Sequence, residues 1–192
     1  MLAAASVVIT STQQEVEGQW ALYDQHDPSK MRVLPPGTDI SRYGPPRGDE
    51  WNTDVSEELQ RFLSDPRKPM ILILARPDPR KNILRQVEAY ASDPLLRERT
   101  NLVVIAGTRD DLEALDDGPE SVITELLKVI DREDLYGRVA YPKNLCGADI
   151  PVLYRYAAAT RGVHSAVALT EPFGLTLLEA AASSLPVVTT ND

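Results

Sequence analysis

Two glutamates near the C-terminus flank a turn that can accommodate an anion. Glu171 stands in a turn marked by a proline and a glycine, and Glu179 lies eight residues on, about two turns into a run of helix-forming residues. The backbone N–H groups of Phe173, Gly174 and Leu175 are expected to point outward at the start of that helix, where anions are favoured. A phosphate held by these amides, with an acid on each side to bind hydroxyl groups, suits a sugar nucleotide.

The spacing of the two acids also has a plainer explanation. Glu171 can be an acid favoured by the dipole at the start of the helix, and Glu179 a solvated surface residue. Spacing alone favours this explanation, because two acids eight positions apart are common in sequences without a site. The choice therefore depends on the residues around them.

The complete string around the acids resembles a known donor-site signature. Residues 171–190 read EPFGLTLLEAAASSLPVVTT. This is similar to the pattern of retaining glycosyltransferases with the GT-B fold, in which E-x-F-G-L is followed by a second Glu, a helix of small residues and Gly-Leu-Pro-Val-Val. Ser184 stands where that glycine is usual. The resemblance implies that Glu171 is a catalytic residue beside the donor sugar and that Glu179 binds the ribose.

Composition excludes several classes of partner. The 192-residue chain carries a net charge of -9, so it offers no broad basic surface for nucleic acid or an anionic membrane. Its single cysteine, Cys146, excludes an intrachain disulfide and fits a reducing, cytoplasmic location. No apolar run approaches the length of a membrane span, and no cluster has metal-ligand spacing. We expect neither a metal nor a cofactor.

The first third of the chain does not predict a complete domain. An apolar strand is expected over 4–10, followed by a helix from Ser11 or Thr12 to Tyr23 with Glu15 as its capping-box partner. One strand and one helix cannot bury both faces, so we expect 1–43 to be the tail of a preceding domain and the crossing from it. The segment 44–68 is expected to be an exposed linker followed by a short helix over 54–63, capped by Asp or Ser.

A regular alternation of strands and helices begins at residue 69. Strands are predicted over 70–75, 102–106, 139–141, 163–169 and 186–190, and helices over 82–91, 119–130, 150–160 and 174–183. Apolar strands separated by helices indicate an α/β fold, a Rossmann-like parallel sheet with helices on both faces. Ligands of such sheets bind beyond the carboxyl ends of the strands. We therefore expect 69–192 to be an incomplete donor-binding domain.

The first strand end carries two cations. Arg76 and Lys81 lie five residues apart in the sequence ARPDPRKN at 75–82. Across a turn they could converge on a diphosphate and stabilise the charge of a departing diphosphate, although a solvated basic turn is the preferred explanation for the segment alone. The string resembles S/A-R-x-x-x-x-K-N of the same glycosyltransferases, and more closely R-P-D-P-x-K-N of sucrose-phosphate synthases. The resemblance implies that Arg76 and Lys81 hold the donor phosphates as catalytic residues.

Gly107 opens the loop after the second strand, in the string GTRDD at 107–111. Glycine permits a sharp turn or the close approach of a ligand, and a loop turn alone is the plainer explanation. The string resembles G-x-R-D-D of sucrose-phosphate synthases. The resemblance implies that Gly107 is a donor-binding residue.

A third segment resembles the same synthases. Residues 131–143 read DREDLYGRVAYPK, similar to D-x-x-D-L-Y-G-x-V-A-Y-P-K-H, and Asn144 replaces the final histidine. In that family the loop after this strand holds the nucleotide base, largely through backbone groups. The resemblance implies that Tyr141, Pro142 and Lys143 form the base edge of the donor site.

The resemblance to sucrose-phosphate synthases extends over essentially the whole chain. It implies transfer of glucose from UDP-glucose to fructose 6-phosphate, giving sucrose 6-phosphate, by a longer enzyme of which this chain is a fragment, inactive alone because the acceptor half is absent. Two alternatives remain. One is a non-catalytic module that binds UDP-sugars or regulates a synthase. The other is a related glycosyltransferase, such as sucrose synthase or mannosylfructose-phosphate synthase.

Overall fold

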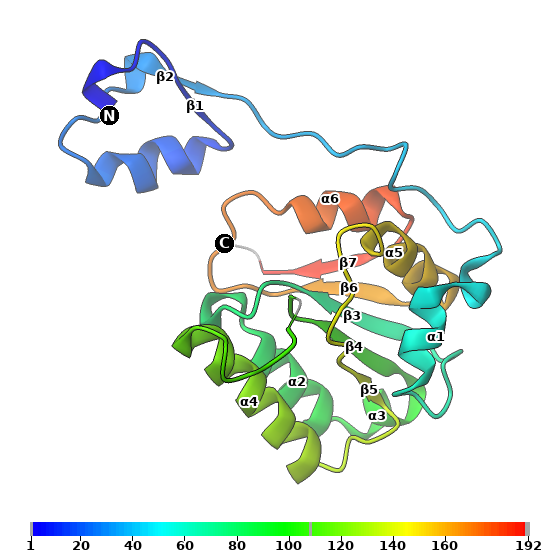
Figure 1. The fold of residues 1–192 in the computed structure, drawn as a ribbon. Helices are drawn as coiled ribbons and strands as arrows, with labels where there is room; N and C mark the ends of the chain where they lie inside the picture. Colours follow the sequence, from blue (N-terminus) through cyan, green and yellow to red (C-terminus); the bar gives the residue numbers. More distant parts are fainter. Residues whose placement is uncertain (1, 108, 191–192) are drawn as a thin grey trace.

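The structure, a computed structural model, describes residues 2–107 and 109–190, most of which form a five-stranded sheet between two layers of helices (Figure 1). The strands are β1 (Val8–Thr10), β2 (Met31–Val33), β3 (Met70–Leu74), β4 (Asn101–Ile105), β5 (Val139–Ala140), β6 (Val163–Ala166) and β7 (Val187–Thr189). The helices are α1 (Asp54–Gln60), α2 (Ile83–Ser92), α3 (Pro94–Arg99), α4 (Asp117–Arg132), α5 (Ile150–Ala159) and α6 (Leu175–Ala182).

The large sheet has the strand order β5-β4-β3-β6-β7, and every pair in it is parallel. From β3 the chain first extends the sheet through β4 to β5, and then crosses to the other side of β3 to form β6 and β7. The connection therefore reverses direction between β3 and β6. In open α/β sheets this reversal leaves a crevice at the carboxyl ends of the two strands, where ligands bind.

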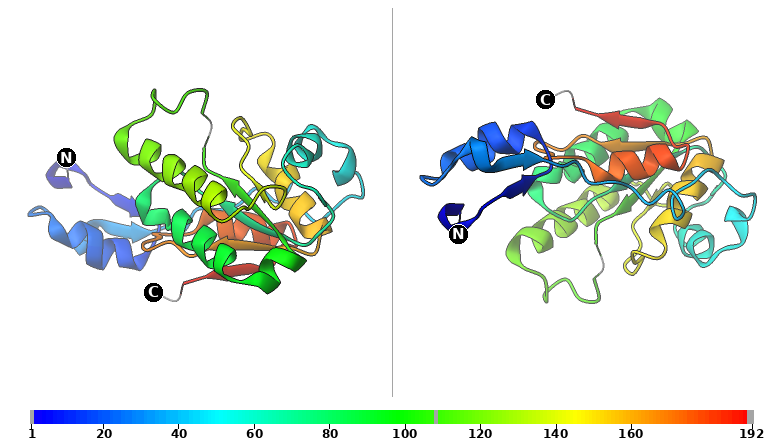
Figure 2. Two further views of the ribbon diagram at one scale, coloured as in Figure 1. Left: turned by 90° about the horizontal axis from the view of Figure 1, so that it is seen from below. Right: turned by 90° about the horizontal axis from the view of Figure 1, so that it is seen from above.

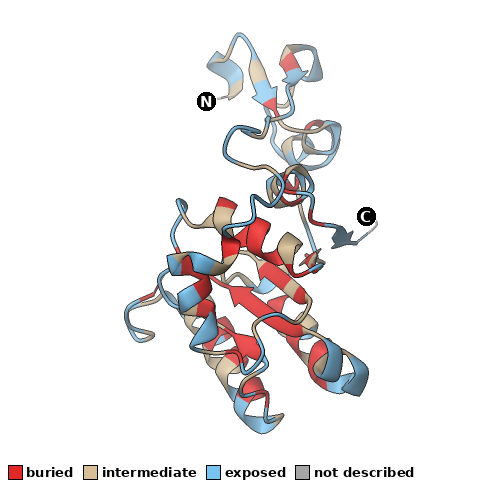
Figure 3. Ribbon diagram, turned by 90° about the vertical axis from the view of Figure 1, so that its right-hand side faces the viewer, coloured by how far each residue is buried: buried red, intermediate tan, exposed pale blue. Residues whose placement is uncertain are grey.

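Helices cover both faces of the sheet, which confirms the predicted layering. Helices α1, α5 and α6 pack on one face, where Leu59, Tyr156 and Ala180 meet Leu72 of β3. Helices α2 and α4 pack on the other, as Figure 1 shows, and the buried residues drawn in red in Figure 3 gather on the strands and between the layers. Strand β4, which lies between β5 and β3, is buried along its whole length, which explains the run of apolar residues that follows Asn101. Within the described residues, no helix is both long and apolar enough to cross a lipid bilayer.

The predicted strands and helices of the main sheet are confirmed, although four of the five strands are shorter than predicted. The strand predicted over 163–169 ends at Ala166, so the loop that precedes α6 is longer than expected. Helix α3 was not predicted from the sequence. It begins at Pro94 because the side chain of Asp93 accepts hydrogen bonds from the N–H groups of Leu95 and Leu96.

The turn between α6 and β7 explains how a serine replaces a glycine. Ser184 has φ of +60°, the left-handed conformation that glycine adopts without strain. The N–H of Ser184 donates to the carbonyl of Ala181, and the N–H of Leu185 donates to the carbonyl of Ala180. This is the hydrogen-bond pattern of a Schellman motif, so the helix ends as tightly with serine as with glycine.

The N-terminal segment lies at one end of the molecule, beyond the sheet (Figure 2). β1 and β2 pair in parallel, but the strand predicted over 4–10 is wrong in its first half, because Leu2–Ala4 forms a 3-10 turn. The predicted helix forms, but as a π-helix over Glu15–Gln19 followed by a 3-10 helix over Trp20–Leu22 rather than as a regular α-helix. Apolar side chains remain exposed here (Ile9 by 64% and Leu22 by 85%), so this segment buries little of its own surface.

The predicted capping residues of this N-terminal segment are in place. The N–H of Glu15 donates to Oγ1 of Thr12 at 3.1 Å, and a carboxylate oxygen of Glu15 accepts from the N–H of Thr12 at 3.4 Å. The capping box thus forms although no regular α-helix follows it.

The sequence predicts that the segment over 44–52 is exposed throughout. The structure shows instead that part of it is buried, because it is anchored to α5. Glu50 is only 1% exposed and accepts hydrogen bonds from the N–H groups of Arg47 and Gly48. One of its oxygens also lies 3.9 Å from Nε of Arg155 on α5. Although burial raises the pKa of Glu50, these donors and the arginine lower it below its ordinary value.

The residue that caps helix α1 differs from the one that the sequence indicated. The cap is Thr53, whose Oγ1 accepts from the N–H of Ser56, while Oγ of Ser56 accepts from the N–H of Thr53. The prediction of Asp or Ser at the cap is therefore wrong, because Thr53 and Ser56 form a reciprocal pair.

Candidate functional site

Two loops at the carboxyl ends of β3 and β6 are tied together across the crevice. The N–H of Leu169 donates to the carbonyl of Arg80 at 2.8 Å, and the side chain of Asn82 donates to the carbonyl of Val167 at 3.1 Å. Asn82 has φ of +56°, a conformation that asparagine tolerates better than most residues. These bonds place Lys81 beside the loop that carries the first glutamate.

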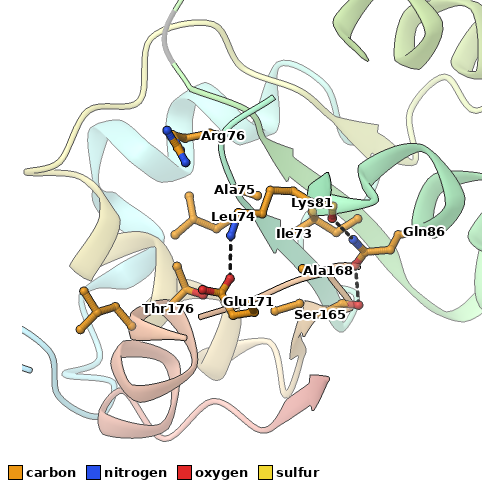
Figure 4. Close-up of a pocket in the computed structure, with 12 residues that line it drawn as sticks. Ile73, Leu74, Ala75, Arg76, Lys81, Gln86, Ser165, Ala168, Glu171 and Thr176 are labelled. Carbon is orange, nitrogen blue, oxygen red and sulfur yellow. Dashed lines mark hydrogen bonds and ion pairs between the residues drawn. The ribbon is translucent and has the colours of Figure 1, made fainter. Parts of the chain in front are cut away.

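Lys81 and Glu171 form an ion pair across this crevice (Figure 4). Nζ of Lys81 lies 2.7 Å from Oε2 of Glu171, and the other carboxylate oxygen accepts from the N–H of Gly174 at 3.2 Å. Both side chains are partly buried, with 20% and 29% exposed. The structure thus brings together two predicted site residues that are 90 positions apart in the sequence.

A cavity of about 200 Å³ opens beside this ion pair. Lys81 and Glu171 line it together with Arg76, and on its inner side Oγ of Ser165 donates to Oε1 of Gln86 at 2.7 Å (Figure 4). Sequence reasoning missed Gln86 and Ser165. Both sit among buried apolar residues of α2 and β6, and only the pairing of those elements shows that they face the crevice.

Arg76 lies between two cavities. Its side chain is exposed and points away from the Lys81–Glu171 pair, as Figure 4 shows. A second cavity of about 370 Å³, on the other side of Arg76, is lined mainly by apolar residues, including Leu74, Ile105, Leu145 and Ile150. The two cations therefore belong to the same crevice, with Lys81 on its inner side and Arg76 where the cavities meet.

The second cavity is lined by Gly107 but not by the three residues that were predicted to form the base edge. Gly107 lines it with φ of +73°, and a Cβ placed there would lie 3.5 Å from Pro77. Tyr141, Pro142 and Lys143 do not line it themselves. They belong to the loop after β5, whose next turn supplies Leu145, Cys146 and Gly147 to the cavity wall.

The start of α6 has the backbone that the sequence predicts, but one of its amides is already bonded. Gly174 is the N-cap with φ of +86°, and a Cβ there would lie 2.9 Å from Cδ1 of Leu177. Leu175 is exposed and lines the first cavity, while Phe173 is half-buried. The N–H of Gly174 is directed at Glu171, so the acid occupies part of the predicted anion site in this structure.

Glu179 lies deeper along α6, where two tyrosines contact it. The hydroxyl of Tyr154 on α5 lies 3.4 Å from Oε2 of Glu179 and 3.2 Å from the carbonyl of Thr176. Tyr43 approaches from the crossing segment, and its ring lies 6.0 Å from that of Tyr154. Burial first, and the charge of Glu179 second, raise the pKa of both tyrosines. Sequence reasoning missed both tyrosines, although an aromatic hydroxyl within the apolar sequence of α5 was a signal for Tyr154.

His164 is a buried, neutral residue of β6 beneath this group. Its Nδ1 lies 3.1 Å from the carbonyl of Leu72, so Nδ1 carries the proton, and Nε2 has no partner within the described residues. The ring of Tyr154 packs against it at 5.6 Å. Burial lowers the pKa of His164 to about 4 from its ordinary 6.5, which supports the structural role expected of a lone histidine in an apolar strand.

The buried histidine predicts a loss of stability in acid. The folded-state pKa of His164 lies below its ordinary value, so the unfolded chain binds a proton at this residue more readily than the folded chain does. The contribution of His164 to the free energy of unfolding is therefore complete above about pH 6.5, and it is lost as the pH falls toward the folded-state pKa of about 4. Between about pH 7 and about pH 5 the free energy of unfolding should fall by up to ~2 kcal/mol through this group. Denaturant titrations should show a smaller fall for His164→Gln than for the wild type. An equal fall in both proteins would contradict the assignment.

The sequence matches a family model and a group of curated relatives. The model for "Glycosyl transferases group 1" matches residues 54–192. A probable sucrose-phosphate synthase from Beta vulgaris is 44% identical over 225 residues, which covers 100% of this chain and 22% of the relative. Sucrose-phosphate synthase 1 from Arabidopsis thaliana is 42% identical, with the same coverage of both chains. The chain spans about a fifth of the length of these curated relatives.

The fold also matches solved structures. Sucrose-phosphate synthase from Thermosynechococcus elongatus superposes with a TM-score of 0.74 at 25% identity, covering 98% of this chain and 41% of that one. Anabaena HepE in complex with UDP superposes with a TM-score of 0.72 at 21% identity, covering 96% and 44%, which supports the fold alone. The family model matches residues 54–192, which include all five strands of the large sheet. The chain therefore belongs to the group 1 glycosyltransferases.

Proposed function

We propose that this chain forms the donor-binding part of a glycosyltransferase of the sucrose-phosphate synthase type, which transfers glucose from UDP-glucose to fructose 6-phosphate. The observation that carries the proposal is the Lys81–Glu171 pair at the strand switch point, where a cation and an acid from two separate motifs meet beside a cavity. The 44% identity to a probable sucrose-phosphate synthase supports the choice of substrates.

In this proposal the donor diphosphate binds between the two cavities. Arg76 offers a planar fork of donors and Lys81 a compact charge, a combination suited to phosphate oxygens. The chain as a whole carries a net charge of -9, so a doubly charged ligand needs such local cations. Lys81 is held by Glu171 in the present structure and would be shared between the acid and the diphosphate.

The proposed reaction breaks the bond between the anomeric carbon and a diphosphate oxygen. A new bond forms from that carbon to the acceptor hydroxyl oxygen, and the proton of that hydroxyl passes to an oxygen of the departing diphosphate. Negative charge grows on the departing diphosphate, so Arg76 and Lys81 stabilise the transition state more than the bound donor. Glu171, at the same end of the crevice, would accept hydrogen bonds from the hydroxyl groups of the sugar and orient it.

The remaining contacts to the donor are assigned from where the residues lie relative to the proposed diphosphate site. Glu179 would bind ribose hydroxyls near the first turns of α6, and the cavity that includes Gly107 would hold the base. Residues 69–192 would be the donor-binding domain, 44–68 a linker, and 1–43 the tail and crossing of an acceptor-binding domain. The apolar side chains that remain exposed in the N-terminal segment support this division. The acceptor would bind mainly through the part of the relatives that this chain does not span.

The proposal is tested by calorimetric titration of the purified chain with UDP, GDP, ADP and UDP-glucose. Saturable binding that favours UDP and UDP-glucose is the expected result. Selective binding of GDP or ADP would contradict the proposed donor. A folded chain, verified by its far-UV spectrum, that binds none of them would contradict a donor site formed by these residues.

A further inference from the structure

Arg109 is a buried arginine that the proposed chemistry does not use. Its side chain is only 7% exposed, just beyond the carboxyl end of β4. Within the described part of the chain it forms no ion pair with a carboxylate, and burial lowers its pKa. Placing an arginine in such a position costs free energy unless its donors are satisfied, so its partners indicate its role.

Within the described residues, the hydrogen bonds that Arg109 donates go to one loop, the loop after β5. Its guanidinium donates to the carbonyl of Tyr141 at 3.0 Å and to that of Pro142 at 3.3 Å. Its backbone N–H donates to the carbonyl of Lys143 at 3.0 Å. Three successive carbonyl groups are therefore held by a single residue, which joins the loop after β4 to the loop after β5.

The held loop forms a wall of the second cavity. Immediately after Lys143, Leu145, Cys146 and Gly147 line that cavity, which Arg76 also lines. On its other side the ring of Tyr141 packs against Phe62 at 4.9 Å. The loop is thus fixed from two directions, by an aromatic contact and by Arg109.

We propose that Arg109 is a positioning residue that holds the base-binding wall of the donor site in register with the diphosphate-binding residues. The inference rests on the proposed function, because it takes the second cavity as the base site. A nucleotide must reach the base wall and Arg76 at the same time, so the spacing between them determines affinity. Arg109 keeps that spacing through a fork of donors which lysine cannot reproduce.

The inference predicts a selective loss of nucleotide affinity. Arg109→Met keeps the apolar stem but removes both side-chain donors, and should lower the affinity for UDP about tenfold, as for the loss of charge-assisted hydrogen bonds. The affinity for inorganic diphosphate, which does not touch the base wall, should change less than about twofold by the same argument. Arg109→Lys should lie between the wild type and Arg109→Met.

Both variants are expected to fold, since no carboxylate loses its partner and the backbone bond to Lys143 remains. Arg132→Ala, at an exposed arginine of α4, is the matched control and should leave both affinities unchanged. Amide hydrogen exchange without ligand should become faster over 141–145 in Arg109→Met, while α4 keeps the wild-type rates.

Wild-type exchange over 141–145 together with an unchanged ratio of UDP to diphosphate affinity would overturn the inference. Equal losses for UDP and diphosphate would also overturn it, because they would indicate a general structural defect. A wild-type chain that binds no nucleoside diphosphate would contradict the proposed function instead, and hydrogen exchange would then decide whether Arg109 holds the loop.

Discussion

Replacing Lys81 with alanine should lower the affinity for UDP by about 10- to 100-fold, the range expected when a charge-assisted hydrogen bond to phosphate is lost. The loss is compounded by Glu171. Without Lys81, its partly buried carboxylate lacks its ion-pair partner and faces the incoming diphosphate with an uncompensated negative charge. Lys81→Ala should therefore have the largest effect on binding of any single substitution in the crevice.

Arg76→Ala should weaken UDP binding by about tenfold, at the lower end of the same range. Arg76 is exposed, so removing it leaves no buried group without a partner and should not change stability. Calorimetry of both variants measures these effects. Arg85→Ala is the matched control, because Arg85 is an exposed cation on α2 that pairs with Glu88. Unchanged UDP affinity in both Arg76→Ala and Lys81→Ala would contradict the diphosphate assignment.

Substitutions of Glu171 and Glu179 should differ in how they change the affinities for UDP and for UDP-glucose. Glu171→Gln removes the charge that pairs with Lys81 and frees that cation for the diphosphate. UDP affinity should therefore remain the same or rise, while UDP-glucose affinity should fall about tenfold because a sugar hydroxyl loses its carboxylate acceptor. This divergence between two ligands that differ only in the sugar would place Glu171 at the sugar.

Glu179→Gln should weaken UDP and UDP-glucose alike, by about tenfold, because both ligands carry the ribose. Tyr154 and Tyr43 can still contact the amide, so the helix should remain in place. Glu125→Gln, on the outer surface of α4, controls for a general effect of losing one negative charge. If Glu171→Gln and Glu179→Gln each changed the two affinities equally, the assignment of sugar to one and ribose to the other would be wrong.

The amino-acid sequence alone determined the strands of the main sheet and, apart from α3, the helices that cover it. Strand β3 is apolar throughout and β4 is apolar after Asn101, which indicates burial on both faces, and α4 has a clear apolar stripe. The candidate residues Arg76, Lys81 and Glu171 were also visible, because each lies just beyond a strand and within a recognisable string. Local patterns of this kind need no knowledge of which strands are neighbours.

The N-terminal segment shows where local patterns fail. Thr12 and Glu15 form the predicted capping box, yet the turns that follow are π and 3-10 rather than α. A short helix depends on packing for most of its stability, and this segment has little apolar surface to pack against. The capping signal and the presence of a helix were therefore correct, while the type of helix was not predicted.

Only the tertiary structure decided which of the candidate residues meet. Lys81 pairs with Glu171 because β6 lies beside β3 in the sheet, an order that hydrophobic periodicity does not specify. For the same reason, sequence patterns do not specify that Arg109 binds the loop after β5, or that Glu179 is the residue near which Tyr43 and Tyr154 lie. These contacts join segments 25 to 136 residues apart, and such distant pairs are set by the packing of whole elements.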